Sequence, residues 1–433
     1  MSAFFMGLIL NTIISLMLFI NISEAQVWQH ESKKEWNKAT QIKYSNWVSS
    51  KLGSDFFNDL GRPFSSLRLD CADAHYALLA YFSKQEGLPF AIDNGNLNNL
   101  TTRFNDISNL DARFVAFVRY IAGSYGTESL SHADTYPISF KTLRPGDLFM
   151  YKIGSSGGYT RHTYILKNIN PDGTFDVVYS TQADAKAGRP LRRRPSYMFN
   201  HAPSNTGSDK NYWGFRRQKP SELSATAQEQ IPGADFSQYD LARLYRNEPL
   251  SFFREVKQAN QSVTESPQML ITRNLNNICG SLNDRIDIVT EAQNFLGRTN
   301  NQCMAFQDFD AYSTPSRDSG LGDEFLTLAY DFNDIVDRGR GDRIGNNLFV
   351  IAQAALDKQR NSNQDQSLTT FCKVEFTSGV DGYTNIGRFF DALFDGDVSF
   401  HPNDNIYRRW GYDEGRRTSC LEHYGYARPL VRM

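Results

Sequence analysis

The sequence contains one cysteine whose surroundings suit nucleophilic chemistry. Cys71 follows Asp70, and apolar residues then recur every three to four positions, at Ala74, Leu78, Tyr81 and Phe82. This pattern predicts a helix over 71–86, with Asp70 as its N-cap and Gly87 as its stop signal. The positive end of a helix dipole favours a thiolate over a thiol, and the thiolate is the nucleophilic form of cysteine. Cys71 is therefore a candidate catalytic nucleophile.

A cysteine nucleophile needs a base that accepts its proton, and His162 is the best candidate. It begins an expected strand directly after a Gly/Ser-rich loop at 154–158, so its side chain can enter a cleft beside the cysteine helix. His75 is the nearest alternative in the sequence. It lies one turn further along the same helix, which favours a packing or supporting role over that of the base.

A third polar group would orient the base, and the sequence leaves its identity open. The candidates follow the strand that pairs with the one carrying His162: Tyr179, Ser180, Thr181 and Gln182. We select Gln182, because its amide oxygen can accept a hydrogen bond from the imidazole. A structural role at the end of the strand is the alternative.

The elements that position these residues follow from hydrophobic spacing and turn signals. Helices are expected at 33–57 and 111–122, with an Asn/Asp-rich loop at 93–112. The later pattern is one of short strands, and its clearest turn is Asn170-Pro171-Asp172-Gly173. The expected strands are 148–151, 162–166, 175–180 and 212–217. Helices followed by consecutive strands predict an α+β domain over 27–220.

Beyond this domain the composition changes twice. Residues 221–234 are rich in Ser, Gln, Ala and Pro, which is typical of a linker. From 235 to 433 apolar residues recur at helical spacing, and we expect a mainly helical C-terminal domain there. The segment 312–318 is interpreted as a loop and cap ahead of a helix at 323–337, or as part of a cleft between the domains.

The first 25 residues have the pattern of an export signal. Residues 3–20 are almost wholly apolar and precede Ser23-Glu24-Ala25, a small-x-small motif that a signal peptidase can cleave before Gln26. No Lys or Arg precedes the apolar stretch, so an uncleaved anchor is the alternative. We expect a signal peptide over 1–25, export to the periplasm or the medium, and no membrane span after cleavage.

The chain has five cysteines, and four of them lie in the C-terminal half. These four are Cys279, Cys303, Cys372 and Cys420. In an oxidising compartment they predict two disulfides, for which three pairings are possible, and their spacing does not favour a zinc site. Cys71 is then left unpaired, which favours a functional role over that of a buried structural cysteine.

Composition excludes several classes of function. A formal net charge of −2 with mixed signs argues against nucleic-acid binding, and a mean hydropathy of −0.49 excludes a polytopic membrane protein. The basic cluster formed by Arg189 and residues 192–194 could hold an anionic polymer, although a solvated loop is the simpler interpretation. No cofactor or metal is expected, because Asp395, Asp397 and Asp404 do not fit the spacing of a calcium loop. The oligomeric state stays open.

Several of these pieces together resemble the NlpC-type cell-wall cysteine peptidases of the papain-like superfamily. The matching pieces are Gly61-Arg62-Pro63-Phe64, Asp70-Cys71, Leu143 to Phe149 (Leu-x-Pro-Gly-Asp-Leu-Phe) and Arg161-His162. The resemblance covers the N-terminal domain and implies a helix packed on an antiparallel sheet. It also implies cleavage of peptide or amide bonds in peptidoglycan, or in another cell-envelope polymer, through a Cys71 thioester. Phe64, Asp70 and Arg161 become candidate substrate-binding residues.

The sequence departs from this family at three points. Ala72-Asp73 stand where the family usually has Ser-Gly, Phe64 stands in place of a tyrosine, and an insertion near 92–141 lengthens the stretch between Cys71 and His162. Two alternatives therefore stay open beside hydrolysis. One is an acyltransferase or transglutaminase-like enzyme, in which an amine captures the thioester. The other is a catalytically inactive module that binds the cell wall.

Overall fold

The computed structural model describes residues 26–58, 64, 67–155, 158–187, 191–199, 201–206, 211–246, 248–356, 386–412 and 417–423. The expected signal peptide over 1–25 lies outside the described residues. Among the helices of the described part, none is long and apolar enough to cross a membrane.

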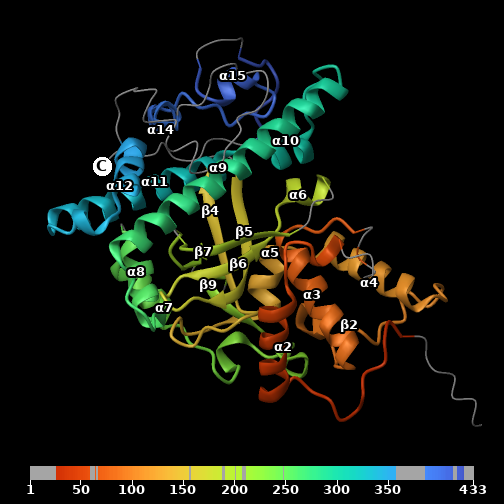
Figure 1. The fold of residues 1–433 in the computed structure, drawn as a ribbon. Helices are drawn as coiled ribbons and strands as arrows, with labels where there is room; N and C mark the ends of the chain where they lie inside the picture. The colour runs from red at the N-terminus through yellow and green to blue at the C-terminus, as the bar shows by residue number, and fades with distance from the viewer. Residues whose placement is uncertain are drawn as a thin grey trace, which may run out of the picture.

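An antiparallel sheet forms the centre of the N-terminal half (Figure 1). Its strands are β3 (Thr135–Pro137), β4 (Leu148–Ser155), β5 (Gly158–Ile169), β6 (Phe175–Tyr179), β7 (Arg192–Tyr197) and β9 (Asn211–Gln218). They lie in the order β3-β9-β4-β5-β6-β7, and β8 (Ser204–Thr206) pairs with β9 outside this order. The short strands β1 (Ala91–Ile92) and β2 (Leu97–Asn98) form a separate hairpin.

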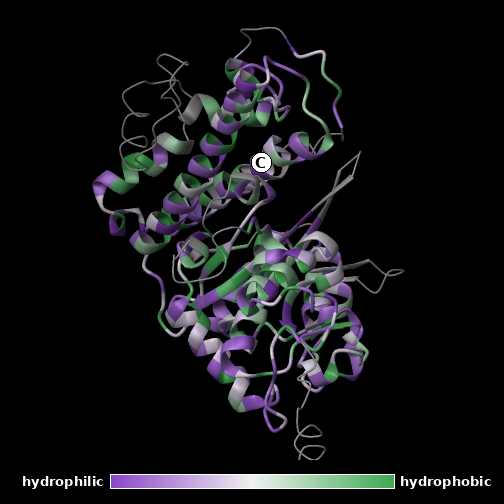
Figure 2. Ribbon diagram, turned by 90° about the vertical axis from the view of Figure 1, so that its right-hand side faces the viewer, coloured by the Kyte–Doolittle hydropathy of each residue, from purple (hydrophilic) through white to green (hydrophobic). Residues whose placement is uncertain are grey.

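Helices cover both faces of this sheet. On one face, α2 (Lys38–Lys51), α3 (Cys71–Glu86) and α4 (Leu110–Ser124) share a core with Met150, Ile165 and Val178. On the other face, α7 (Ser237–Leu244) and α8 (Pro249–Asn260) share a core with Phe149 and Tyr164. Because side chains alternate along a strand, neighbouring residues of β4 and β5 belong to different cores. Figure 1 shows the sheet between these two layers of helices, and in Figure 2 hydrophobic residues are concentrated in the interior of this half of the molecule.

The cysteine helix is confirmed at its predicted bounds, because both end signals form. The Asp70 carboxylate accepts hydrogen bonds from the backbone N–H groups of Ala72 and Asp73, and the Asp73 carboxylate accepts one from the N–H of Asp70. Gly87 ends the helix in the left-handed conformation, with φ of 62°. The helix expected at 33–57 is shorter, since Asn37 caps α2 and Leu52 ends it.

The predicted hairpin also forms. The turn after Asn170 joins β5 to β6, and Gly173 has a φ of 81°, which only glycine adopts readily. The same turn contacts the chain that leaves α8, because the N–H groups of Ser262 and Val263 donate to the Pro171 carbonyl. Residues 192–194 of the basic cluster belong to strand β7, so the interpretation of that cluster as a solvated loop is wrong. Arg189 lies outside the described residues.

The C-terminal region is mainly helical. It contains α9 (Pro267–Arg298), α10 (Phe306–Tyr312), α11 (Pro315–Asp337), α12 (Asn346–Leu356), α14 (Ile386–Asp395) and α15 (Ile406–Arg409). A disulfide joins Cys303 to Cys420, and Cys279 is also disulfide-bonded. Cys372 lies outside the described residues.

The segment expected to be a linker packs against the N-terminal half of the molecule. Ile231, inside the segment 221–234, is buried in the core that the sheet shares with α7 and α8. The Ser221 hydroxyl donates to the Pro89 carbonyl, and the Arg216 guanidinium donates to the Gln228 side chain. These contacts fix the segment to the sheet layer, and α7 and α8 complete the sheet's second face. The independent helical core begins with α9.

Candidate active site

Cys71 is the first residue of α3, and its thiol is buried against two neighbours. The Sγ atom lies 3.6 Å from Thr127 Oγ1, and the backbone N–H of Thr163 also donates to the thiol. Burial and the adjacent Asp70 carboxylate raise the pKa of Cys71 to about 12, against the lowering effect of these two hydrogen bonds. Burial and the Asp70 charge therefore oppose the thiolate that the helix terminus is expected to favour.

His162 lies on β5, with its ring among tyrosines. The centroid of the ring lies 4.6 Å from Tyr164, 5.5 Å from Tyr179 and 5.9 Å from Tyr151. Burial, followed by the charge of Arg317, lowers the pKa of His162 to about 3. The imidazole is therefore neutral at pH 7, which is the form that can accept a proton.

Cys71 and His162 line the same cavity, which has a volume of about 420 Å³. The alternation of β5 assigns Thr163 to the face that α3 covers and His162 to the opposite face. Among the hydrogen bonds of the described residues, none joins the Cys71 thiol to the imidazole. Such bonds are often long in unliganded enzymes and shorten when substrate binds.

The other predicted site residues are divided between the cavity and the core. Asp70, Arg161 and Gln182 line the cavity with Cys71 and His162. Gln182 is exposed and begins the short helix α6 (Gln182–Ala187), and within the described structure no hydrogen bond links it to the imidazole.

Two further predicted residues lie away from the cavity. Phe64 is 1 % exposed and packs in the core against Phe57 and Tyr81, which leaves it no surface for a substrate. Residues 61–63 of the same motif lie outside the described structure. His75 is fully buried, and one of its ring nitrogens is 3.0 Å from Gln218 Oε1, in agreement with a packing role.

Sequence reasoning missed two parts of the cavity wall. The first is His201, whose ring centroid lies 4.5 Å from that of Tyr151, and whose pKa burial lowers to about 4. The second comes from the C-terminal region, where α9, α10 and α11 contribute Ser281, Asp284, Phe306, Asp310, Ala311, Arg317, Gly320 and Glu324. The second interpretation of the segment 312–318, as part of a cleft between the domains, is the one sequence-based expectation that agrees with this wall. Ser313, Pro315 and Arg317 of that segment line the cavity.

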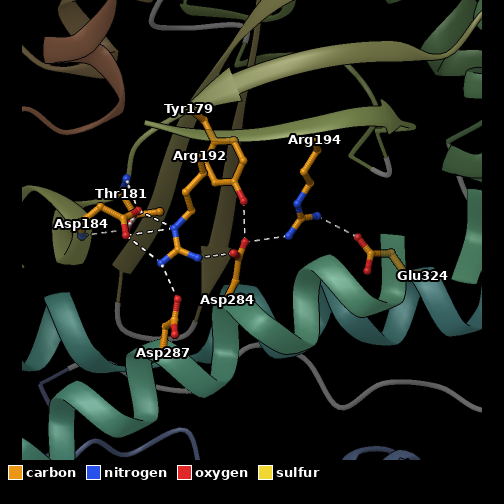
Figure 3. A network of polar contacts seen from close by, with 8 residues as sticks. All are labelled: Tyr179, Thr181, Asp184, Arg192, Arg194, Asp284, Asp287 and Glu324. Carbon is orange, nitrogen blue, oxygen red and sulfur yellow. Dashed lines mark hydrogen bonds and ion pairs between the residues drawn. The ribbon is translucent and has the colours of Figure 1, made fainter. Parts of the chain in front are cut away.

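A network of charges joins the sheet to the helices at this cavity (Figure 3). Arg192 of β7 makes a forked ion pair with Asp184 and also contacts Asp284 of α9. Arg194 Nη2 lies 2.8 Å from Asp284 Oδ2, and its Nη1 lies 3.1 Å from Glu324 Oε1 of α11. The Tyr179 hydroxyl also donates to Asp284. The two arginines thus hold α9 and α11 against the sheet.

The pKa values of Asp284 and Glu324 shift in opposite directions, because the arginines offset burial to different extents. Burial alone would raise the pKa of Asp284, but the guanidiniums of Arg194 and Arg192 outweigh it and lower the pKa to about 2. Burial raises the pKa of Glu324 to about 7, and Arg194 offsets this only in part. No group of three or more metal-binding side chains occurs within the described ranges.

The raised thiol pKa predicts a particular pH dependence of labelling. Only the thiolate reacts with iodoacetamide, so labelling of Cys71 in the non-reduced protein should rise about tenfold per pH unit up to at least pH 10. Peptide mass spectrometry after timed quenching measures the rate, with glutathione labelled in parallel as the control. A plateau near pH 8.5 for Cys71 would contradict the burial seen here.

Comparisons with protein-family models, with curated proteins and with solved structures give no match for this chain.

Proposed function

We propose that the protein is an exported papain-like cysteine hydrolase that cleaves peptide or amide bonds in peptidoglycan stem peptides. The observation that carries this proposal is the placement of Cys71, at the start of α3, and His162, on β5, in the wall of one cavity. The apolar segment at 3–20 and the disulfide between Cys303 and Cys420 support export. The short motifs shared with NlpC-type peptidases support the substrate class.

The charge states favour a neutral pair over a thiolate–imidazolium pair. As Cys71 Sγ attacks the carbonyl carbon, His162 takes the thiol proton and then delivers it to the leaving amine. This gives a thioester and a free amine. Water then attacks the thioester with His162 as its base, which releases a carboxylic acid and restores the thiol. The Asp70 carboxylate accepts from the N–H groups of Ala72 and Asp73, and the Cys71 N–H is our candidate donor to the oxyanion.

Two observations favour a second candidate, a wall-binding module without catalytic activity. The Cys71 thiol and the His162 ring share no hydrogen bond within the described structure, and the pKa of Cys71 is raised to about 12. A buried neutral thiol is also what a structural cysteine presents.

Incubation with purified muropeptides separates the possibilities. Mass spectrometry of the products reports cleavage, and intact mass of acid-quenched protein reports an acyl group on Cys71. Cleavage in buffer supports the hydrolase, and an amide product that forms only with added amine supports an acyltransferase. Saturable binding of muropeptides without either product would overturn the enzymatic proposal and support the binding module.

A further inference from the structure

Three arginines line the cavity, and two of them are neutralised by nearby carboxylates. Arg161 Nη2 lies 2.8 Å from Glu128 Oε1. Arg194 is paired with both Asp284 and Glu324. The third is Arg317, in the first turn of α11, and in the described part of the chain no carboxylate forms an ion pair with it.

The carboxylate next to Arg317 in the sequence is already committed elsewhere. Asp318 Oδ1 lies 2.6 Å from Arg285 Nε, and Asp318 Oδ2 accepts a hydrogen bond of 2.7 Å from the Thr314 hydroxyl. Arg285 is fully buried, so this pairing is fixed inside the helical core. Arg317 itself is half-buried and its charge faces the cavity that holds Cys71 and His162.

We propose that Arg317 binds a free carboxylate of the substrate, so that the enzyme selects peptides with an anionic group close to the bond that is cleaved. This inference rests on the proposed function, because it assigns a substrate class to the same cavity. A partly buried guanidinium without a partner is a strong site for a carboxylate, since its planar fork can donate two hydrogen bonds to it.

Arg317 also connects substrate binding to the reactivity of His162. Its positive charge disfavours protonation of the imidazole, and after burial it is the largest cause of the lowered pKa of His162. A carboxylate bound to Arg317 cancels that charge locally. His162 then becomes a stronger base when an anionic substrate is present, and stays a weak one in the empty site.

Two alkylating reagents of nearly equal size test this subsite. Iodoacetate carries a carboxylate and iodoacetamide is neutral, and in both cases the Cys71 sulfur displaces iodide from carbon. The ratio of the iodoacetate rate to the iodoacetamide rate, measured at pH 9.5, cancels differences in thiol pKa between variants. We expect Arg317→Gln to lower this ratio by about fivefold or more, because the favourable charge at the site is lost.

Two further variants control for charge. Arg317→Lys keeps the charge but loses the planar fork, so it should lower the ratio by less than Arg317→Gln does. Arg338→Gln removes one positive charge from the other end of the same helix, where Arg338 is exposed and paired with Asp334, and should leave the ratio unchanged. A ratio in Arg317→Gln within about twofold of the unmodified protein would overturn the subsite.

A second measurement does not depend on the reactivity of Cys71. Difluoroacetate, followed by ¹⁹F NMR at pH 7, should show a saturable shift with the unmodified protein and none with Arg317→Gln. If Cys71 reacts with neither reagent but difluoroacetate binds through Arg317, the proposed nucleophile fails and the anion site stands. If Cys71 reacts and difluoroacetate does not bind, the nucleophile stands and the anion site fails.

Discussion

Replacement of Cys71 by alanine lowers the turnover of muropeptides by about three orders of magnitude or more, because no other group in the mechanism can form the thioester. The variant should fold normally, since among the described residues the thiol's hydrogen bonds are those to Thr127 and the Thr163 backbone. Turnover is measured by chromatography of the released peptides, and folding by circular dichroism and thermal unfolding. A folded Cys71→Ala protein that retains turnover would falsify the hydrolase proposal.

The same assay decides which histidine is the base. His162→Ala should match the loss seen for Cys71→Ala, because effects within one catalytic unit are not additive. His201→Gln should lose much less, since the His201 ring packs against Tyr151 and the proposed mechanism gives it no proton to transfer. A larger loss for His201→Gln than for His162→Ala would transfer the role of base to His201.

Replacement of Asp284 by asparagine destabilises the protein by about 3 kcal/mol, because it removes the negative charge that pairs with two partly buried guanidiniums. Arg192 and Arg194 both contact this carboxylate, and Tyr179 donates to it as well. Equilibrium urea unfolding, followed by tryptophan fluorescence, measures the loss. The matched control is Asp287→Asn, one turn along α9, whose carboxylate is 48 % exposed and 3.6 Å from Arg192. That variant should lose less than about 1 kcal/mol.

The stability that the Asp284 carboxylate contributes should depend on pH. The pKa of Asp284 falls from 3.8 to about 2 on folding, so its ionised form stabilises the folded state above about pH 4. This contribution is lost as the pH falls from about 4 to about 2. The difference in stability between the unmodified protein and Asp284→Asn should therefore shrink over that range. Equal losses for Asp284→Asn and Asp287→Asn at pH 7 would show that the network of Figure 3 does not hold the two layers together.

Local signals in the sequence predicted the elements that carry the candidate nucleophile and base. Asp70 and Gly87 mark both ends of α3 because capping depends on the neighbouring residues alone. The turn between Asn170 and Gly173 is equally local, and it sets the pairing of β5 with β6. His162 lies further back on β5, where it pairs with Tyr151 of β4.

Long-range packing explains what the sequence did not reveal. Residues 192–194 are three consecutive arginines, which is typical of a solvated loop, yet they lie in β7. Carboxylates from α6, α9 and α11 pair with the first and third arginine, and Asp176 of β6 pairs with the second. The pKa of Cys71 follows from burial, to which residues far away in the sequence contribute. The sequence predicts a strand over 175–180 with Gln182 close to its end, but β6 stops at Tyr179 and Gln182 is the first residue of α6.

Because α9, α10 and α11 form part of the cavity wall, the cavity is complete only after these helices have been synthesised. A ribosome releases Cys71 and His162 long before it reaches Asp284, Arg317 and Glu324, which complete the cavity. The bond between Cys303, just ahead of α10, and Cys420 spans 117 residues, so it forms only after all of α10, α11 and α12 have been synthesised. A nascent chain therefore carries Cys71 and His162 before the helices that complete the wall of their cavity.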